Sequence, residues 1–348
     1  MNKILSLFDK QTVRLLLEKE VLPLYPEFEK IVSFTIKPYK KLIWTTTYHV
    51  VVAYRLVLAK ANGEEHKIEI VCSAHSHEAR ENVFKVLNFL WNSGLPGDGI
   101  ALPRPLFFNS EFNGTFYRAI EGKNLLNFIK LNNREKVKSM VVQAAGLFAR
   151  LHALSLPANA KEIFVEDNSL LRTVVPGRDL IVWEIGQRFQ EKYVHDIADF
   201  YDRFIKQEEE FFASTTKRWL IHGDAHPENV IAVGADKIGL IDFTDFCLAD
   251  FARDFGAFMQ QLEYKIKRNL QDDEFALAMK RLFLNAYLQA ANISLDESLQ
   301  RRLDLYYNWT ATRTATFWLL KHECEPEKAE AMIALVKNYL NTNHHAQD

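Results

Sequence analysis

The chain has 348 residues, of which 48% are hydrophobic and 25% are charged, and its formal net charge is −2. This length is sufficient for two lobes with a sizeable core. The near-zero charge excludes the general electrostatic attraction to nucleic acids or anionic membranes that a strongly basic protein has.

The cysteines and the apolar runs indicate the compartment. Cys72, Cys247 and Cys324 are far apart and lack CxxC spacing, which argues against a disulfide framework or a zinc knuckle. We interpret all three as buried thiols in a reducing compartment. The sequence shows neither a signal-peptide hydrophobic region nor an apolar run of the roughly 18 residues that a membrane span needs. We therefore expect a cytoplasmic protein that binds neither membranes nor nucleic acids; its oligomeric state stays open.

The first 122 residues have the pattern of a small antiparallel sheet that carries one helix. Residues 48–59 are rich in β-branched and aromatic side chains, Asn62-Gly63 gives a turn signal, and alternation resumes at 66–72. This pattern predicts a β-hairpin. Apolar spacing then predicts a helix over 76–93, and residues 103–122 read as two further short strands.

The rest of the chain is predominantly helical. Residues 138–153 and 251–345 have apolar residues at helical spacing, whereas 219–246 contains two or three short apolar runs typical of strands. We therefore predict an α+β fold with two lobes, residues 1–122 and 123–348, divided at Gly122.

The stretch L-I-H-G-D-A-H-P-E-N-V, residues 220–230, is followed by I-D-F-T-D, residues 241–245. Asp224 and Asn229 lie on a loop that Pro227 keeps from forming a regular strand, and Asp242 ends the next apolar run. Phosphoryl transfer needs a carboxylate that positions the attacking hydroxyl, together with carboxylate and amide oxygens that hold Mg²⁺. These three residues could supply that set.

These motifs resemble the signature of the aminoglycoside phosphotransferase and choline kinase-like family of small-molecule kinases. Three further stretches resemble family segments in the same order: E-G-K-N-L at 121–125, L-F-A-R-L-H-A-L at 147–154 and A-D-F-A-R-D-F-G at 249–256. The resemblance extends over roughly residues 35–260. It implies a protein kinase-like fold, with a nucleotide-binding N-lobe and a larger, mainly helical C-lobe for catalysis and substrate binding.

The resemblance also implies roles for individual residues. Asp224 would be the catalytic carboxylate, Asn229 and Asp242 would hold Mg²⁺, and ATP or GTP would donate the phosphate. Ala119 and Glu121 would lie near the nucleotide base. His222 and Asp254 would brace the catalytic loop, and His226 would support the residues that contact substrate and metal. Asp245 would be a structural residue or would face a cationic substrate.

The N-lobe departs from the family pattern in two ways. Family members hold the phosphates with a strand cation paired to a helix glutamate; here the strand position is Lys67 or Glu69, and the helix partner is Glu81 or Glu78. The segment 37–48 also lacks the glycines of a phosphate-binding loop. A catalytically weak, nucleotide-binding regulatory module is therefore the alternative to an active kinase.

Other motifs have competing interpretations. His222, Asp224 and His226 have the spacing of a zinc site, although Gly223 and Pro227 interrupt a continuous strand. His75–Glu78 also has metal-like spacing but reads more simply as a helix start. His152 and the aromatic run 306–322 are interpreted as helix packing, with Trp309 or Arg313 as possible substrate contacts by resemblance. The acceptor is left open among aminoglycosides, amino alcohols, sugars and similar hydroxyl compounds.

Overall fold

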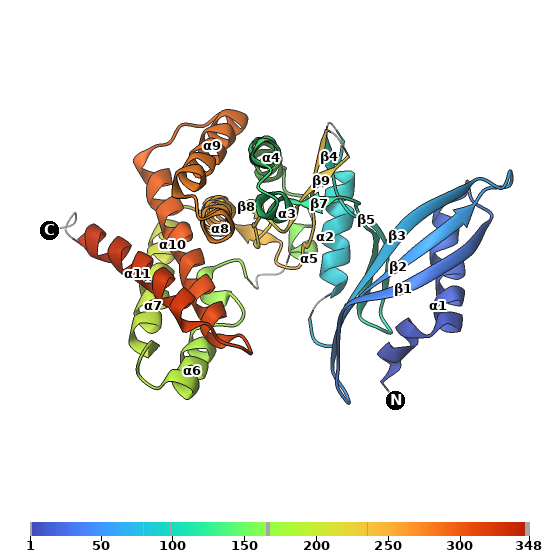
Figure 1. Ribbon diagram of the computed structural model, residues 1–348, viewed down its shortest axis with the longest axis horizontal. Coiled ribbons are helices and arrows are strands. Elements are labelled where there is room, and N and C mark those ends of the chain that lie inside the picture. Colours follow the sequence, from blue (N-terminus) through green and yellow to red (C-terminus); the bar gives the residue numbers. More distant parts are fainter. Residues whose placement is uncertain (1, 79, 98, 165–167, 235, 345–348) are drawn as a thin grey trace. The chain divides into compact units, whose positions relative to one another are not determined.

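A computed structural model describes residues 2–78, 80–97, 99–164, 168–234 and 236–344 (Figure 1). The chain divides into two compact units. Unit 1 comprises Met1–Gly122 with Ile231–Thr244, and unit 2 comprises Lys123–Val230 with Asp245–Asp348. Segment 231–244, which we expected in the second lobe from the sequence, thus groups with the first unit.

Unit 1 is built on an antiparallel sheet with the strand order β1-β2-β3-β6-β5. Its strands are β1 (Lys30–Ile43), β2 (Tyr48–Ala59), β3 (Glu65–His75), β5 (Arg104–Asn109) and β6 (Gly114–Arg118). The predicted hairpin is confirmed, because β2 pairs with β3 along its length. Gly63 in the connecting turn has a φ of +85°, a conformation that glycine adopts without steric cost.

Two helices of unit 1 lie on opposite faces of this sheet (Figure 1). Helix α2 (Arg80–Asn92) is the helix predicted from apolar spacing, and it packs on β5 and β6. The N-terminal elements were not predicted: η1 (Lys3–Phe8), α1 (Lys10–Leu16), η2 (Leu17–Val21) and η3 (Leu22–Leu24). Their apolar side chains share one core with β2 and β3, and the Tyr54 hydroxyl donates to the Leu7 carbonyl at 3.0 Å.

A second, smaller set of strands in unit 1 carries the segment around Asp242. β4 (Ile100–Ala101), β10 (Lys237–Leu240) and β9 (Val230–Val233) are neighbours in that order, and β4 runs parallel to β10. A Cβ at Gly239 would lie 2.3 Å from the end of the Ile120 side chain and 3.2 Å from the Ala101 carbonyl oxygen, so β10 is closely packed at this position. The predicted short strands in 219–246 are confirmed.

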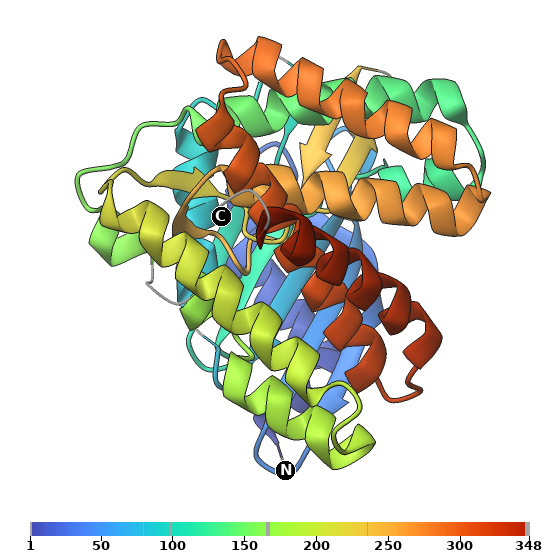
Figure 2. The same ribbon diagram turned by 90° about the vertical axis from the view of Figure 1, so that its left-hand side faces the viewer.

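Unit 2 is mainly helical. Its elements are β7 (Lys123–Asn124), α3 (Leu125–Lys130), α4 (Arg134–His152), α5 (Ala160–Ile163), η4 (Leu171–Thr173), α6 (Arg178–Phe189), α7 (Val194–Ala213), β8 (Trp219–Ile221), β11 (Cys247–Ala249), α8 (Ala252–Leu270), α9 (Asp273–Ala291), α10 (Glu297–Leu320) and α11 (Pro326–His344). Figure 2 shows α6 and α7, in yellow-green, side by side. Helix α8 packs against α10 at Gly256, where a Cβ would lie 2.8 Å from the Tyr307 nitrogen.

The structure confirms the α+β prediction. It corrects two expectations about the burial of single side chains. Cys72 and Cys247 are buried as expected, but Cys324 is exposed. Phe317, which we expected in the helical core, is 59% exposed. Among the described helices, none has the length and apolar character that crossing a bilayer requires.

Candidate active site

The loop that follows β8 in unit 2 is fixed by Asp254. The backbone N–H groups of His222 and Gly223 donate to the Asp254 carboxylate at 2.6 and 2.8 Å. His152 Nε2 lies 3.1 Å from the same carboxylate, and Asp254 is 1% exposed. Burial alone would raise the pKa of Asp254, but these contacts lower it. Asp254 therefore stays ionised and holds the start of the loop, as a brace must.

Gly223 is the residue at which this loop turns. Its φ is +83°, and a Cβ there would lie 2.1 Å from the backbone oxygen of Asp245. β8 and β11 pair antiparallel, with Ile221 opposite Cys247, which brings the two backbones together. Only glycine fits between them, so the second residue of H-G-D is dictated by close backbone approach.

Asp224 is the first of four neighbouring side chains whose charges alternate in sign. Its carboxylate lies 3.2 Å from His226 Nε2, and His226 Nδ1 lies 3.0 Å from Glu228. Lys265 pairs with Glu228 at 2.6 Å. Burial would raise the pKa of Asp224, but the hydrogen bond and charge of His226 lower it to about 2. Burial disfavours the imidazolium, yet contacts with Asp224 and Glu228 raise the pKa of His226 to about 9.

Asn229 is held with its amide nitrogen toward Asp224. Nδ2 donates to the Asp224 carbonyl at 2.9 Å and lies 3.4 Å from the Asp224 carboxylate. The side chain is 5% exposed. Because the amide nitrogen is occupied, the carbonyl oxygen Oδ1 is the atom left for another partner. An amide oxygen held in this way is a ligand of the type that Mg²⁺ prefers.

Asp242 belongs to unit 1 and has an unusual backbone conformation. Its φ is +63°, in the left-handed region, which aspartate tolerates better than most residues. The Thr244 hydroxyl donates to the Asp242 carboxylate at 2.9 Å and accepts from Arg80 Nη1 at 3.1 Å. The side chain is exposed, so its carboxylate is open to a cation. Asp242 therefore also fits the oxygen-ligand requirement of Mg²⁺.

The strand position expected to hold phosphates lacks the expected ion pair. Glu69 accepts from Arg55 at 2.7 Å and from the Tyr39 hydroxyl at 3.1 Å. Lys67 is exposed, and within the described ranges it has no ion-pair partner. Glu81 pairs instead with Lys85, at 3.3 Å. The structure therefore does not join Lys67 to Glu81.

A different cation occupies the start of helix α2. Arg80 is 3% exposed and pairs with Glu78, in addition to its bond to Thr244. Its Nε is buried and has no hydrogen-bond partner among the described residues. This guanidinium links α2 to the turn that carries Asp242. Nothing in the sequence distinguished Arg80 from other arginines, because its burial depends on the tertiary packing of α2.

The zinc interpretation of the catalytic loop is not supported. In the described part of the chain, His49, His75 and Glu78 form the one close set of three metal-capable side chains. Even that set is a poor metal site. His75 Nδ1 accepts from two backbone N–H groups, which leaves the ring proton on Nε2, and Glu78 already pairs with Arg80. In this neutral tautomer His75 offers no free nitrogen to an ion.

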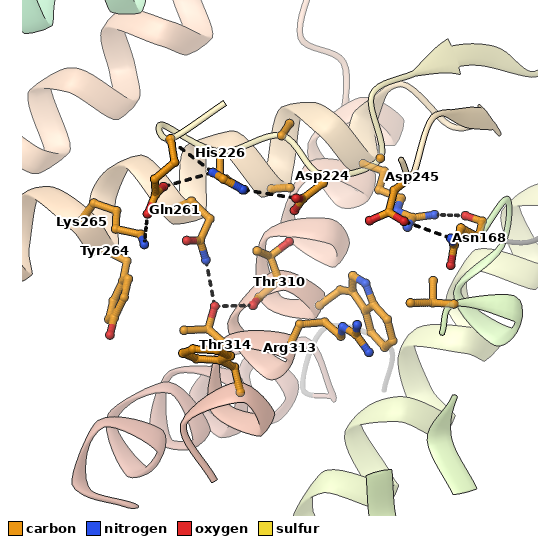
Figure 3. Close-up of a pocket in the computed structure, with 18 of the residues that line it drawn as sticks. Asn168, Asp224, His226, Asp245, Gln261, Tyr264, Lys265, Thr310, Arg313 and Thr314 are labelled. Carbon is orange, nitrogen blue, oxygen red and sulfur yellow. Dashed lines mark hydrogen bonds and ion pairs between the residues drawn. The ribbon is translucent and has the colours of Figure 1, made fainter. Parts of the chain in front are cut away.

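A cavity of about 380 Å³ in unit 2 opens beside Asp224 (Figure 3). Helix α10 contributes Trp309, Arg313 and Phe317 to its lining, and the loop 223–228 contributes Asp224, His226 and Glu228. Asp245 also lines it and accepts from Asn168 at 3.2 Å. The sequence indicated Trp309 and Arg313 by position, but it gave no signal for Lys265 or Asn168, which reach the cavity from distant segments.

His152 was interpreted as a packing residue, and it is more than that. It is 6% exposed and bridges the Tyr287 hydroxyl, at 2.6 Å from Nδ1, to the Asp254 carboxylate. The bridge connects α4 and α9 to the brace of the catalytic loop. Its position in the L-F-A-R-L-H stretch was the only signal available in the sequence.

Comparison with family models gives one match: the phosphotransferase enzyme family model covers residues 47–293. Comparison with curated proteins gives no significant match.

Several solved structures share the fold at low sequence identity. Choline kinase from Cryptosporidium parvum Iowa II superimposes with a TM-score of 0.63 at 13% identity, covering 97% of each chain. The GDP complex of aminoglycoside 2'-phosphotransferase-IIIa gives 0.52 at 14% identity, covering 94% of this chain and 99% of that one. The streptomycin-ATP-APH(2")-IIa ternary complex gives 0.50 at 14%, covering 95% and 96%. The predicted kinase-like architecture is thereby confirmed.

Proposed function

Because this chain belongs to the phosphotransferase enzyme family and is a small-molecule kinase, we propose that it transfers the γ-phosphate of ATP or GTP to a hydroxyl group of a small molecule. The observation that carries this proposal is Asp224. Its carboxylate lines a cavity of substrate size, on a loop held by Asp254, and stays ionised beside His226.

Asp224 acts on the acceptor hydroxyl. The carboxylate accepts a hydrogen bond from the hydroxyl and orients its oxygen toward the γ-phosphorus. As the new O–P bond forms, the bond between the γ-phosphorus and the β–γ bridging oxygen breaks, and the hydroxyl proton leaves through Asp224 to solvent. A pKa of about 2 suits orientation rather than early deprotonation, which is what a loose transition state needs.

Asn229 and Asp242 would hold Mg²⁺ through their side-chain oxygens. The ion, when bound, offsets negative charge on the nucleotide phosphates. Asn229 contributes by presenting its amide oxygen while Asp224 anchors its nitrogen. Asp242 contributes a carboxylate fixed by Thr244.

We assign nucleotide-base binding to the segment Ala119–Glu121. The Ala119 N–H donates to the Glu69 carbonyl at 2.9 Å, which leaves the Ala119 carbonyl as the acceptor for a base. The structural neighbours include complexes with ATP and with GDP, which supports a nucleoside triphosphate donor of either base.

The test is nucleotide consumption over a panel of aminoglycosides, amino alcohols and sugars, with Mg²⁺ and either ATP or GTP. Acceptor-dependent release of the diphosphate is expected for at least one compound, and the Asp224→Asn variant serves as the blank. A thermal shift with Mg²⁺ and nucleotide, but no acceptor-dependent release from any compound, would favour a nucleotide-binding regulatory module instead.

A further inference from the structure

The carboxylates that line the cavity beside Asp224 are each offset by a cation. Asp224 faces His226, and Glu228 faces both His226 and Lys265. Asp245 lies near Arg253. Burial lowers the pKa of Arg253, but surrounding groups, Asp245 among them, raise it above its ordinary value. Among the lining residues that the structure describes, no carboxylate is therefore left uncompensated to attract a polycationic acceptor.

Arg313 also lines the cavity, but its hydrogen bonds go to neutral acceptors. Its Nη1 donates to the Pro176 carbonyl at 3.1 Å and to the Tyr201 hydroxyl at 3.3 Å, and its Nη2 lies 3.4 Å from the Val175 carbonyl. All three acceptors are neutral. Among the residues that the structure places, no carboxylate forms an ion pair with Arg313.

The geometry aims this guanidinium at the cavity. Figure 3 shows Arg313 on the α10 wall, across from the loops that carry Asp224 and Asp245. Its neutral contacts fix the planar group in place without satisfying its charge. A guanidinium preorganised in this way is a strong partner for a carboxylate or a phosphate, because both accept two parallel N–H bonds.

The same wall supplies an apolar surface. Trp309, one helical turn before Arg313, is packed against the Tyr201 ring at 4.8 Å between centroids. Phe317, one turn after it, is 59% exposed. Between these two aromatic side chains, the Arg313 guanidinium has only the neutral contacts given above within the described residues. An anion with a short carbon body thus complements this cavity better than a cation does.

We propose that the acceptor is a hydroxylated small anion, bound through a carboxylate or phosphate group by Arg313 while its hydroxyl meets Asp224. This inference rests on the proposed phosphotransferase function and narrows its substrate class. Arg313 is then the residue that sets specificity for charge.

The experiment uses acceptors that share one skeleton and differ in charge: glycerate and glycerol 3-phosphate as anions, glycerol as the neutral compound and 3-amino-1,2-propanediol as the cation. We expect kcat/KM for one of the anions to exceed that for glycerol by about tenfold or more, through KM. Glycerate and glycerol 3-phosphate distinguish a carboxylate from a phosphate ligand.

Three variants of helix α10 make the test specific. Arg313→Gln should reduce the anion-to-glycerol ratio by about tenfold, and Arg313→Lys should restore part of it. Arg301→Gln, which removes an exposed arginine paired loosely with Glu297 at 3.8 Å, should leave the ratio unchanged. Equal or better use of glycerol or the amine, with no change of ratio in Arg313→Gln, would overturn the proposal.

A binding measurement separates this inference from the proposed function. Anion-dependent thermal stabilisation that disappears in Arg313→Gln would uphold the anion site even if no acceptor were phosphorylated. Transfer to neutral or cationic acceptors without any anion-dependent stabilisation would uphold the kinase function and overturn the anion site.

Discussion

At the scale of single residues, the ionisation of Asp224 depends on His226. The imidazolium lies between Asp224 and Glu228, so its positive charge reduces the repulsion between the two carboxylates. Without that cation, Asn229 is the side-chain donor left to the Asp224 carboxylate among the residues that the structure describes. The histidine of D-A-H therefore supports the charge of the catalytic residue rather than reacting itself.

This arrangement predicts a pH-dependent stability. The folded pKa of His226 is about 9, above the ordinary 6.5, so its contribution is complete below pH 6.5 and is lost as the pH rises through about 9. We expect a loss on the order of 1–2 kcal/mol across that interval. Urea denaturation midpoints at both ends of the interval measure it.

The variant His226→Gln should flatten this alkaline decline, because glutamine has no proton to lose. His195→Gln, a change at an exposed histidine of α7, is the matched control and should retain it. An unchanged decline in His226→Gln would assign the effect to other groups.

Individual site residues differ in how far the sequence predicts them. Asp224, Asn229 and Asp242 stand in short motifs whose residue types match their chemistry, so they could be proposed directly. Gly223 is explained only by the Asp245 backbone 2.1 Å from its absent Cβ. Arg80, whose role depends on burial, could not be predicted, because nothing local distinguishes a buried arginine from an exposed one.

At the scale of elements, helix α2 is joined to the Asp242 turn by a side chain other than the expected one. Arg80 donates to Thr244, and Thr244 donates to Asp242. The glutamate of α2, Glu81, pairs within its own helix. We infer that the buried arginine positions the turn that carries Asp242.

Arg80→Met tests this link. We expect KM for the Mg²⁺–nucleotide to rise about tenfold, because the Asp242 turn loses a donor worth about 1–2 kcal/mol, while Arg80→Lys restores part of the loss. Lys85→Met removes a partly exposed cation of the same helix and is the control. A change in thermal stability alone, with KM unaltered, would give Arg80 a purely structural role.

Element prediction succeeded where the pattern was local. The hairpin of β2 and β3, helix α2 and the short strands near Asp242 follow from periodicity and turn residues. The N-terminal elements before β1 were missed, because short 3-10 and helical segments have no long period. They owe their stability to a shared core with the sheet, in which Ile4 and Val13 are fully buried.

At the scale of the whole molecule, the chain passes from one unit to the other after Gly122, after Val230 and after Thr244. The boundary after Gly122 is visible in the sequence as a change from strand to helix periodicity. The return of 231–244 to unit 1 is not, because which sheet a short strand joins depends on pairing with distant segments such as β4. Asp224 and Asn229 therefore belong to unit 2, and Asp242 belongs to unit 1.

The central claim is that the Asp224 carboxylate orients the hydroxyl that receives the phosphate. Phosphate transfer from labelled nucleotide to the best acceptor of the panel should fall by about 10³-fold in Asp224→Asn, with nucleotide affinity and melting temperature near those of the wild type. Asp179→Asn, at an exposed aspartate of α6, should transfer at the wild-type rate. Transfer by Asp224→Asn within a few-fold of the wild type would contradict the account.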